Sequence, residues 1–296
     1  MPASIDRVRS LPLWKEAVEP VPLKGGLSNE SFTVEDSGRK YVVRLGEDIP
    51  VHHVFRDRER MVSKAAHEAG FAPELVHAEP GVMVFAFIEG KTFAEADVQA
   101  NLERVARLMR DFHRALPNHV GGPAALFWVF HVIRDYARSL TEGRSRFAGQ
   151  LPLYLGLAEE FENAQVPLPV IFGHNDLLPA NFIDDGSRLW LIDFEYAAYS
   201  TAMFDLAGIA SNALFSPEQD RELLAVYFDI APAEQMVRSH AAMKCASLLR
   251  EAMWSMVSEL HLDAPGVDYV AYTAENLSRF EASLESYRSR FGGEAS

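Results

Sequence analysis

The pattern of apolar and polar positions divides this chain into a first part with short strands and a longer part with helices. Over residues 20–45, two apolar runs flank a turn signal at 36–38, which is typical of adjacent β-strands. Two more strands are expected at 72–77 and 81–88. The second of these is apolar at nearly every position, which predicts a buried central strand. The first part is therefore expected to form a small β-rich lobe.

Helical periodicity dominates the rest of the chain. The clearest case begins at Asp97, a good N-cap, and places apolar residues at 3.6-residue spacing as far as Leu116, where Pro117 ends the helix. Similar apolar stripes occur in both parts of the chain. They predict helices at 1–19, 55–70, 97–116, 126–147, 151–164, 205–215, 218–229, 233–261 and 267–292.

One stretch, residues 171–196, departs from the helical pattern and predicts a strand, a loop, a strand, a turn and a strand. A turn signal at 184–187 lies inside it, and the last strand runs directly into Asp193. Because a hairpin brings its two ends together, Asp176, Asn181 and Asp193 are expected to face one point.

These three side chains have the chemistry of a magnesium site. Carboxylate and amide oxygens are hard ligands, and Mg²⁺ takes one or two carboxylates together with water and substrate phosphates. We expect Asn181 and Asp193 to hold the metal and Asp176 to accept a proton from a hydroxyl. The alternative is an ordinary hairpin with surface carboxylates, and the full set in this order favours the site.

The same stretch resembles a known family. Residues 174–181 are H-N-D-L-L-P-A-N, and I-D-F-E-Y follows at 192–196. The spacing from Asp to Asn matches the catalytic loop of protein kinases. The central Asn and the missing D-F-G instead resemble the choline/ethanolamine kinase branch of the aminoglycoside phosphotransferase-like family. The resemblance is specific over residues 171–210 and looser over about residues 20–285.

This resemblance implies an α+β, protein-kinase-like, bilobal fold that uses ATP and Mg²⁺. It places an N-terminal nucleotide-binding lobe at 1–88, a hinge at 89–91 and a mainly helical catalytic lobe at 92–296. A Gly-Gly step before a strand lets the backbone approach phosphates closely, and the adenine would lie at the hinge. The residues expected to contact the nucleotide are Gly25, Gly26, Ser28, Asn29, Arg44, Phe87, Ile88 and Glu89.

The resemblance also implies supporting roles. Arg44 would contact the α- and β-phosphates and would pair with Glu59, with Glu68 as the competing partner. His174 would brace the catalytic loop by a hydrogen bond to Asp205, so both are assigned to structure rather than to chemistry.

A cationic amine is recognised by aromatic faces and by nearby carboxylates. Trp254 lies in a segment that resembles the tryptophan-rich helix of choline kinases, where the family often carries a second Trp at the position of Glu251. A carboxylate there would favour a primary ammonium, which offers N–H donors, and this brings ethanolamine forward. The residues expected at the substrate are Glu195, Tyr196, Tyr199, Glu251, Trp254, Tyr269 and Tyr272.

Composition narrows the class of protein. The 296 residues are 48% hydrophobic with a net charge of −14, which fits a globular protein and argues against general nucleic-acid binding. We expect no membrane span, because no apolar run approaches about eighteen residues. A single cysteine and an N-terminus without an apolar signal segment predict a cytoplasmic protein. The last helix could support a homodimer.

The sequence therefore predicts a small-molecule kinase. It would transfer the ATP γ-phosphoryl group to the hydroxyl of a small cationic amino alcohol, choline or ethanolamine. Two alternatives stay open: a phosphotransferase for another amine-bearing alcohol (an aminoglycoside, homoserine or a sugar amine), and a catalytically silent module that binds nucleotides or amines.

Overall fold

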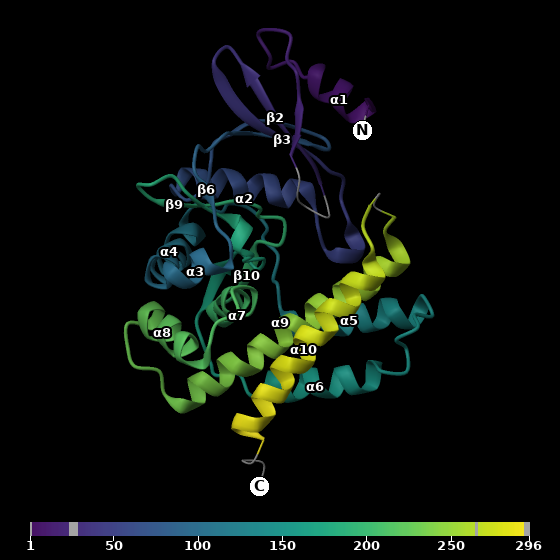
Figure 1. Cartoon of the computed structure of the whole chain (residues 1–296), viewed down its shortest axis with the longest axis vertical. Coiled ribbons are helices and arrows are strands. Elements are labelled where there is room, and N and C mark those ends of the chain that lie inside the picture. Colours follow the sequence, from purple (N-terminus) through teal and green to yellow (C-terminus); the bar gives the residue numbers. More distant parts are fainter. Residues whose placement is uncertain (1, 24–28, 264–265, 293–296) are drawn as a thin grey trace.

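A five-stranded antiparallel sheet forms one end of the molecule (Figure 1). The computed structural model describes residues 2–23, 29–263 and 266–292. In spatial order the strands are β1 (Val21–Leu23), β2 (Glu30–Asp36), β3 (Arg39–Leu45), β5 (Val82–Ala86) and β4 (Leu75–Glu79). Alternation along β2 buries Phe32 and Val34, which join Val8 and Leu11 in one apolar cluster. Helix α1 (Pro2–Arg9) and the segment after it thus contribute to the core of this lobe.

Helix α2 (Arg56–Glu68) lies between the sheet and the helical part (Figure 1). Its buried residues Val62, Ala65 and Ala66 belong to the large apolar cluster of the helical lobe. The N-terminal turns of α2 carry charged residues, and one of these, Glu59, is completely buried. This helix therefore places a carboxylate at the junction of the two lobes.

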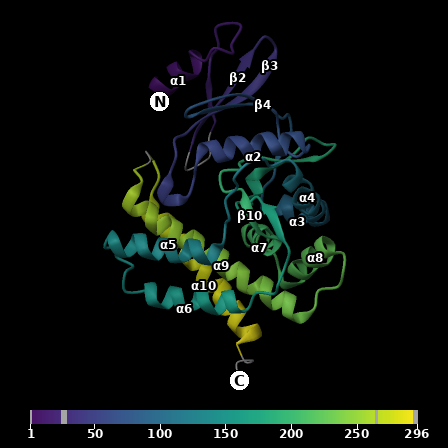
Figure 2. The same cartoon turned by 180° about the vertical axis from the view of Figure 1, so that it is seen from behind.

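The second lobe is mainly helical. Its helices are α3 (Glu95–Ala100), α4 (Leu102–Ala115), α5 (Val129–Glu142), α6 (Leu151–Asn163), α7 (Ala202–Asn212), α8 (Pro217–Phe228), α9 (Glu234–His261) and α10 (Tyr269–Phe291). Helix α9 packs against α5, α6, α7, α8 and α10, and Figures 1 and 2 show α9 and α10 crossing this lobe together. Because neighbours cover it on many sides, α9 is apolar around much of its circumference.

Two small sheets position the loops between the lobes. Strand β6 (Lys91–Thr92) pairs with β8 (Phe182–Asp184), which pairs with β9 (Leu189–Leu191). Gly90 permits this pairing, because a Cβ there would lie 2.7 Å from the Asp184 carbonyl oxygen. Strand β7 (Val170–Gly173) pairs with β10 (Ala198–Thr201).

The α+β, protein-kinase-like prediction is confirmed, while some element bounds differ. The first helix ends at Arg9 rather than near residue 19, because Pro12 cannot continue it. The helix expected at 97–116 is two helices, since the Asn101 amide donates to the Asp97 carbonyl and interrupts the backbone pattern.

Asp97 is not the N-cap. It lies in the first turn of α3, where its carboxylate accepts a hydrogen bond from the Ala94 N–H. Strands β6 and β10 were not predicted, because each is short and lacks a strong apolar pattern. The expected hinge at 89–91 stays a prediction. Within the described part of the chain, no helix is both long enough and apolar enough to cross a membrane.

Candidate active site

Asp176 lies in the loop between β7 and β8. Asn175 before it adopts a left-handed conformation, φ +62°, and its side-chain amide donates to the Tyr196 and Ala198 carbonyls at 3.1 and 3.2 Å. Asn tolerates this backbone conformation better than most residues. The middle Asn of the H-N-D motif thus fixes the loop to the segment that enters β10.

Asp205 anchors the same loop from the first turn of α7. Its buried carboxylate accepts hydrogen bonds from the backbone N–H of His174 at 2.8 Å and of Asn175 at 2.7 Å. It also accepts one from Nε2 of His113 at 2.8 Å. Burial by itself would raise the pKa of Asp205, but these hydrogen bonds and the two histidines outweigh it and lower that pKa.

This geometry corrects the expected role of the His174 ring. Only the backbone of His174 contacts Asp205, while its ring nitrogen Nε2 donates to the Ile192 carbonyl at 2.9 Å. His113 of α4 instead supplies the ring that bonds Asp205. His174 still braces the site, because Ile192 immediately precedes Asp193.

The two expected metal ligands lie beside the catalytic loop. The Asn181 amide nitrogen donates to the Asp176 carbonyl at 2.8 Å, so its amide oxygen is the atom that can act as a ligand. Asp193 has φ +69°, and its Oδ1 accepts a hydrogen bond from Arg44 Nη2 at 2.8 Å. No group of three or more His, Cys, Asp or Glu suited to a metal occurs among the described residues. Asn181 and Asp193 supply an amide oxygen and a carboxylate, which are oxygen ligands of the kind that Mg²⁺ takes together with water and phosphates.

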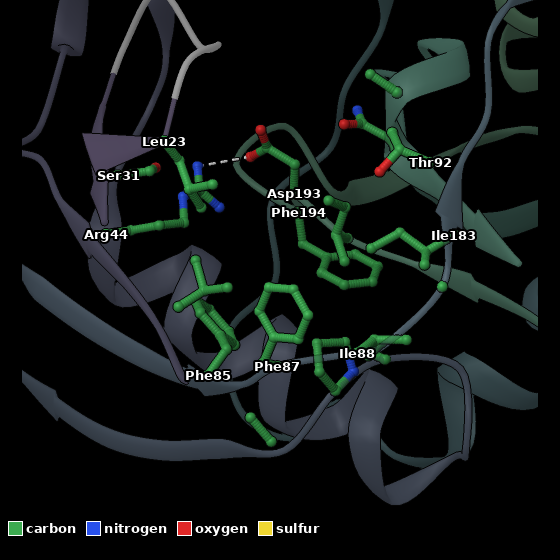
Figure 3. A pocket seen from close by; sticks show the side chains of 18 of the residues that line it. Leu23, Ser31, Arg44, Phe85, Phe87, Ile88, Thr92, Ile183, Asp193 and Phe194 are labelled. Carbon is green, nitrogen blue, oxygen red and sulfur yellow. Dashed lines mark hydrogen bonds and ion pairs between the residues drawn. The ribbon is translucent and has the colours of Figure 1, made fainter. Parts of the chain in front are cut away.

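A cavity of about 400 Å³ opens between the five-stranded sheet and the β8–β9 hairpin, and we call it the interlobe cavity. Asp193 and Arg44 meet at one end of it (Figure 3), and Asn181 also lines the cavity. Much of its remaining wall is apolar and comes from both lobes, including Leu23, Val42, Phe85, Phe87, Ile88, Ile183, Ile192 and Phe194. An apolar slot with charged groups at one end suits a flat base with attached phosphates.

The structure places the predicted nucleotide residues unequally. Asn29, Arg44, Phe87 and Ile88 line the interlobe cavity. Glu89 is not among the lining residues, and its carboxylate instead pairs with Lys40 at 2.6 Å. Gly25, Gly26 and Ser28 lie outside the described residues.

A buried ion network joins the lobes at the charged end of the cavity. Arg44 Nη1 lies 2.7 Å from Glu59, which settles the pairing in favour of Glu59 over Glu68. Arg56 Nη1 lies 2.7 Å from the other Glu59 oxygen and 3.0 Å from Glu195. Glu195 is therefore part of this network, and its expected role as a contact for the substrate cation or as support for the metal site stays a prediction.

Four aromatic residues gather on the other side of Asp176, and we call them the aromatic cluster: Tyr196, Trp254, Tyr269 and Tyr272. Trp254 Nε1 donates to the Tyr196 hydroxyl at 3.0 Å, and its ring lies 6.4 and 6.1 Å from the rings of Tyr269 and Tyr272. The Tyr272 hydroxyl donates to Glu251 at 2.9 Å. Five of the expected substrate residues thus lie in one group.

Asp176 is half-buried and shares a small pocket with Glu251, Arg250 and Leu248, which we call the acceptor pocket. Burial raises the pKa of Asp176 well above its ordinary value. The Glu251 and Asp193 carboxylates raise this pKa further, whereas the Arg250 guanidinium opposes the rise. A carboxyl group with a raised pKa beside a cleft is well suited to accept a proton.

Comparison with known proteins agrees with this geometry. The family model described as choline/ethanolamine kinase matches residues 21–220. The chain belongs to the choline/ethanolamine kinase family.

Individual members of the family are distant from this chain. The LicA protein of Haemophilus influenzae is 27% identical over 209 residues, covering 69% of this chain and 61% of LicA. A probable ethanolamine kinase of Arabidopsis thaliana is 26% identical, covering 84% of this chain and 75% of that protein. This chain thus spans less than two thirds of that LicA protein.

The fold is shared with solved structures of the family. A choline/ethanolamine kinase family protein from Mesorhizobium loti superposes with a TM-score of 0.76 at 24% identity, covering 96% of this chain and 94% of that one. At this identity the likeness concerns the fold.

Tyr199 is the member of the predicted substrate set that lies elsewhere. It is on β10, and its ring packs edge-on against Phe172 of β7 at 5.0 Å. No ring contact joins it to Trp254 among the described residues, so Tyr199 lies outside the aromatic cluster, and its role at the substrate stays a prediction. The family motif spans both tyrosines, but only Tyr196 comes before the strand and enters the aromatic cluster.

Sequence reasoning missed three residues of the site. Arg56 is paired with Glu59 at i,i+3 spacing on α2, a signal visible in the sequence. His52 stacks on Trp254 with ring centroids 4.6 Å apart, and burial lowers its pKa to about 3, so it stays neutral. Arg250 precedes Glu251 on α9 and lies over the Tyr196 ring. Neither His52 nor Arg250 has a local sequence signal for these contacts.

Proposed function

We propose that this chain transfers the γ-phosphoryl group of ATP to the hydroxyl of choline or ethanolamine. The observation that carries the proposal is the position of Asp176. Its backbone carbonyl holds Asn181 of the interlobe cavity, while its side chain lines the acceptor pocket with Glu251. A group at this junction can meet a hydroxyl from one side and a phosphate from the other.

On the nucleotide side, the apolar walls near Phe87 and Ile88 take the base, and Arg44 donates to the phosphates. Asn181 and Asp193 hold Mg²⁺, which when bound neutralises charge on the β- and γ-phosphate oxygens. Glu59 fixes the Arg44 guanidinium at 2.7 Å, so the phosphate donor is oriented before the nucleotide binds.

On the acceptor side, Asp176 accepts a hydrogen bond from the substrate hydroxyl and then takes its proton. The raised pKa of Asp176 increases its affinity for that proton. The aromatic cluster and Glu251 attract the amine, since ring faces and a carboxylate both favour a cation. The chain's own contribution is thus positioning and electrostatics, as expected for phosphoryl transfer.

The test is amine-dependent ADP release from Mg-ATP with choline and with ethanolamine, and identification of the phosphorylated amine by ³¹P NMR. Asp176→Asn is the matched control, because it keeps the size of the side chain and removes the base. Turnover by the wild type and loss of turnover by at least a hundredfold in the variant are expected. No product with either amine from folded protein that binds nucleotide would overturn the proposal.

A cytoplasmic location and a homodimer stay predictions from the sequence. Cell fractionation and sedimentation analysis would test them.

A further inference from the structure

Arg250 of α9 brings a positive charge into the acceptor pocket. Its side chain is only 5% exposed, and its guanidinium carbon lies 4.5 Å from the centre of the Tyr196 ring. This is the position that a bound cation takes over an aromatic face. The protein's own cation therefore already covers a ring that the substrate amine would otherwise use.

The hydrogen bonds of Arg250 leave it directed at this site. Its Nη1 donates to Glu251 Oε2 at 2.9 Å, and the other Glu251 oxygen accepts from Tyr272 at 2.9 Å. Nε and Nη2 are buried and make no hydrogen bond to any residue in the described ranges. Asp176, Arg250 and Glu251 all line the same pocket. The guanidinium thus places a positive charge in the pocket that Asp176 lines, with Glu251 as its ion-pair partner.

Trp254 offers less free surface than its place in the aromatic cluster suggests. His52 stacks on it at 4.6 Å with 28° between the ring planes, and only 6% of the residue is exposed. The Tyr196 and Trp254 rings are therefore covered, one by Arg250 and one by His52. By contrast, the Glu251 side chain is 25% exposed and borders the pocket.

We propose that Arg250 makes the acceptor site selective for a primary ammonium over a quaternary ammonium. This inference rests on the proposed amino-alcohol kinase activity and names the substrate within it: ethanolamine, or another alcohol that carries a primary amine. Arg250 acts as a specificity-determining residue through the Tyr196 face and through Glu251.

The physical basis is the difference between the two cations. A quaternary ammonium has no N–H, so it depends on open ring faces, and here it would meet a guanidinium of the same charge. A primary ammonium can donate hydrogen bonds to the partly exposed Glu251 carboxylate, and charge-assisted hydrogen bonds are stronger than neutral ones. The pocket should therefore bind the quaternary amine more weakly, whereas Glu251 can still accept hydrogen bonds from the primary amine.

The experiment compares kcat/KM for ethanolamine and choline, together with their mono- and dimethylated intermediates. Wild-type protein should prefer ethanolamine by about tenfold or more, with a stepwise fall as methyl groups are added. Arg250→Gln removes the charge but keeps a donor for Glu251, and Arg250→Met removes both. Each should reduce the preference by about tenfold, mainly through a lower KM for choline, and Arg250→Lys should retain it.

Arg146→Met is the matched control. Arg146 also lies over an aromatic ring, that of Phe147 at 4.3 Å, and also pairs with a glutamate of α9, but it is exposed and does not line the acceptor pocket. It should leave the amine preference unchanged.

Two results would overturn the inference. One is a wild-type preference for choline, which needs no variant to measure. The other is an equal change in kcat/KM for both amines in folded Arg250→Gln, which would assign Arg250 to packing. If no amine gives ADP release, the proposed function itself fails, and this inference fails with it.

Discussion

Asp205→Asn tests whether one buried carboxylate organises the catalytic loop. Asp205 accepts three hydrogen bonds, from the backbone of His174 and Asn175 and from the His113 ring. The amide of Asn has one acceptor oxygen and one donor nitrogen. In one orientation the nitrogen of the variant would face the His174 N–H and the His113 ring, which now bond Oδ2. In the other it would face the Asn175 N–H, which now bonds Oδ1.

The magnitude follows from these contacts. A histidine can change tautomer and accept from the new amide, but a backbone N–H cannot. In either orientation one backbone N–H, that of His174 or that of Asn175, therefore loses its acceptor while buried. Such a loss costs about 1–3 kcal/mol. The remaining bonds lose their charge assistance, which roughly halves their strength. We therefore expect the free energy of unfolding to fall by about 3 kcal/mol, and the melting temperature by about 6 °C.

The assay is thermal unfolding followed by circular dichroism between pH 3 and 7. The folded-state pKa of Asp205 is lowered, so its stabilisation is full above the unfolded value of about 3.9 and is lost as the pH falls below it. The difference in melting temperature between wild type and variant should therefore become smaller toward pH 3. Asp185→Asn is the control, because Asp185 accepts a similar set of hydrogen bonds in an exposed turn. Equal losses in the two variants, or no loss at Asp205, would refute the reasoning.

Three further changes probe the site. Glu59→Gln should lower the free energy of unfolding by about 3 kcal/mol and raise the KM for ATP, because it leaves Arg44 without its buried partner; an unchanged denaturation curve would contradict this. Arg250→Met should move the acidic limb of the pH profile of kcat/KM to higher pH, since the guanidinium opposes the rise in the pKa of Asp176. A shift of this limb to lower pH would contradict the expectation. Asp193→Asn should weaken Mg²⁺-dependent nucleotide binding by tenfold or more. A calorimetric titration of the variant that matches the wild type would show that Asp193 does not bind the metal.

Much of the fold was predictable because local pattern and tertiary packing agree. The apolar stripe that begins after Asp97 is buried over its whole length, so its periodicity reported a real core. The break at Asn101 was not predictable, because it depends on a hydrogen bond from the Asn101 side-chain amide to the Asp97 carbonyl. Strand β6 was missed for a related reason: two residues form a strand only because β8 lies beside them.

The candidate site likewise contains residues that the sequence could predict and residues that it could not. Asp176, Asn181 and Asp193 follow from spacing within one hairpin. Asn181 and Asp193 line the interlobe cavity, and the Asn181 amide donates to the Asp176 carbonyl. Arg250 comes from a helix more than fifty residues further along the chain, and its position over Tyr196 depends on how α9 packs. A charged residue on a largely apolar helix was the one available signal, and it did not say which pocket the charge would enter.

The conformation of Asp193 depends on a residue outside the interlobe cavity. Asp193 adopts a left-handed backbone conformation, which is strained for a residue other than glycine and persists only where surrounding contacts hold it. One such contact is Arg44, which reaches it from the sheet of the other lobe at 2.8 Å. Arg44 is itself oriented by Glu59, a carboxylate with no exposed surface that does not line the cavity. The orientation of Asp193, our proposed metal ligand, is thereby coupled to a helix between the lobes, and a change at Glu59 should alter Mg²⁺-dependent nucleotide binding although Glu59 does not line the cavity.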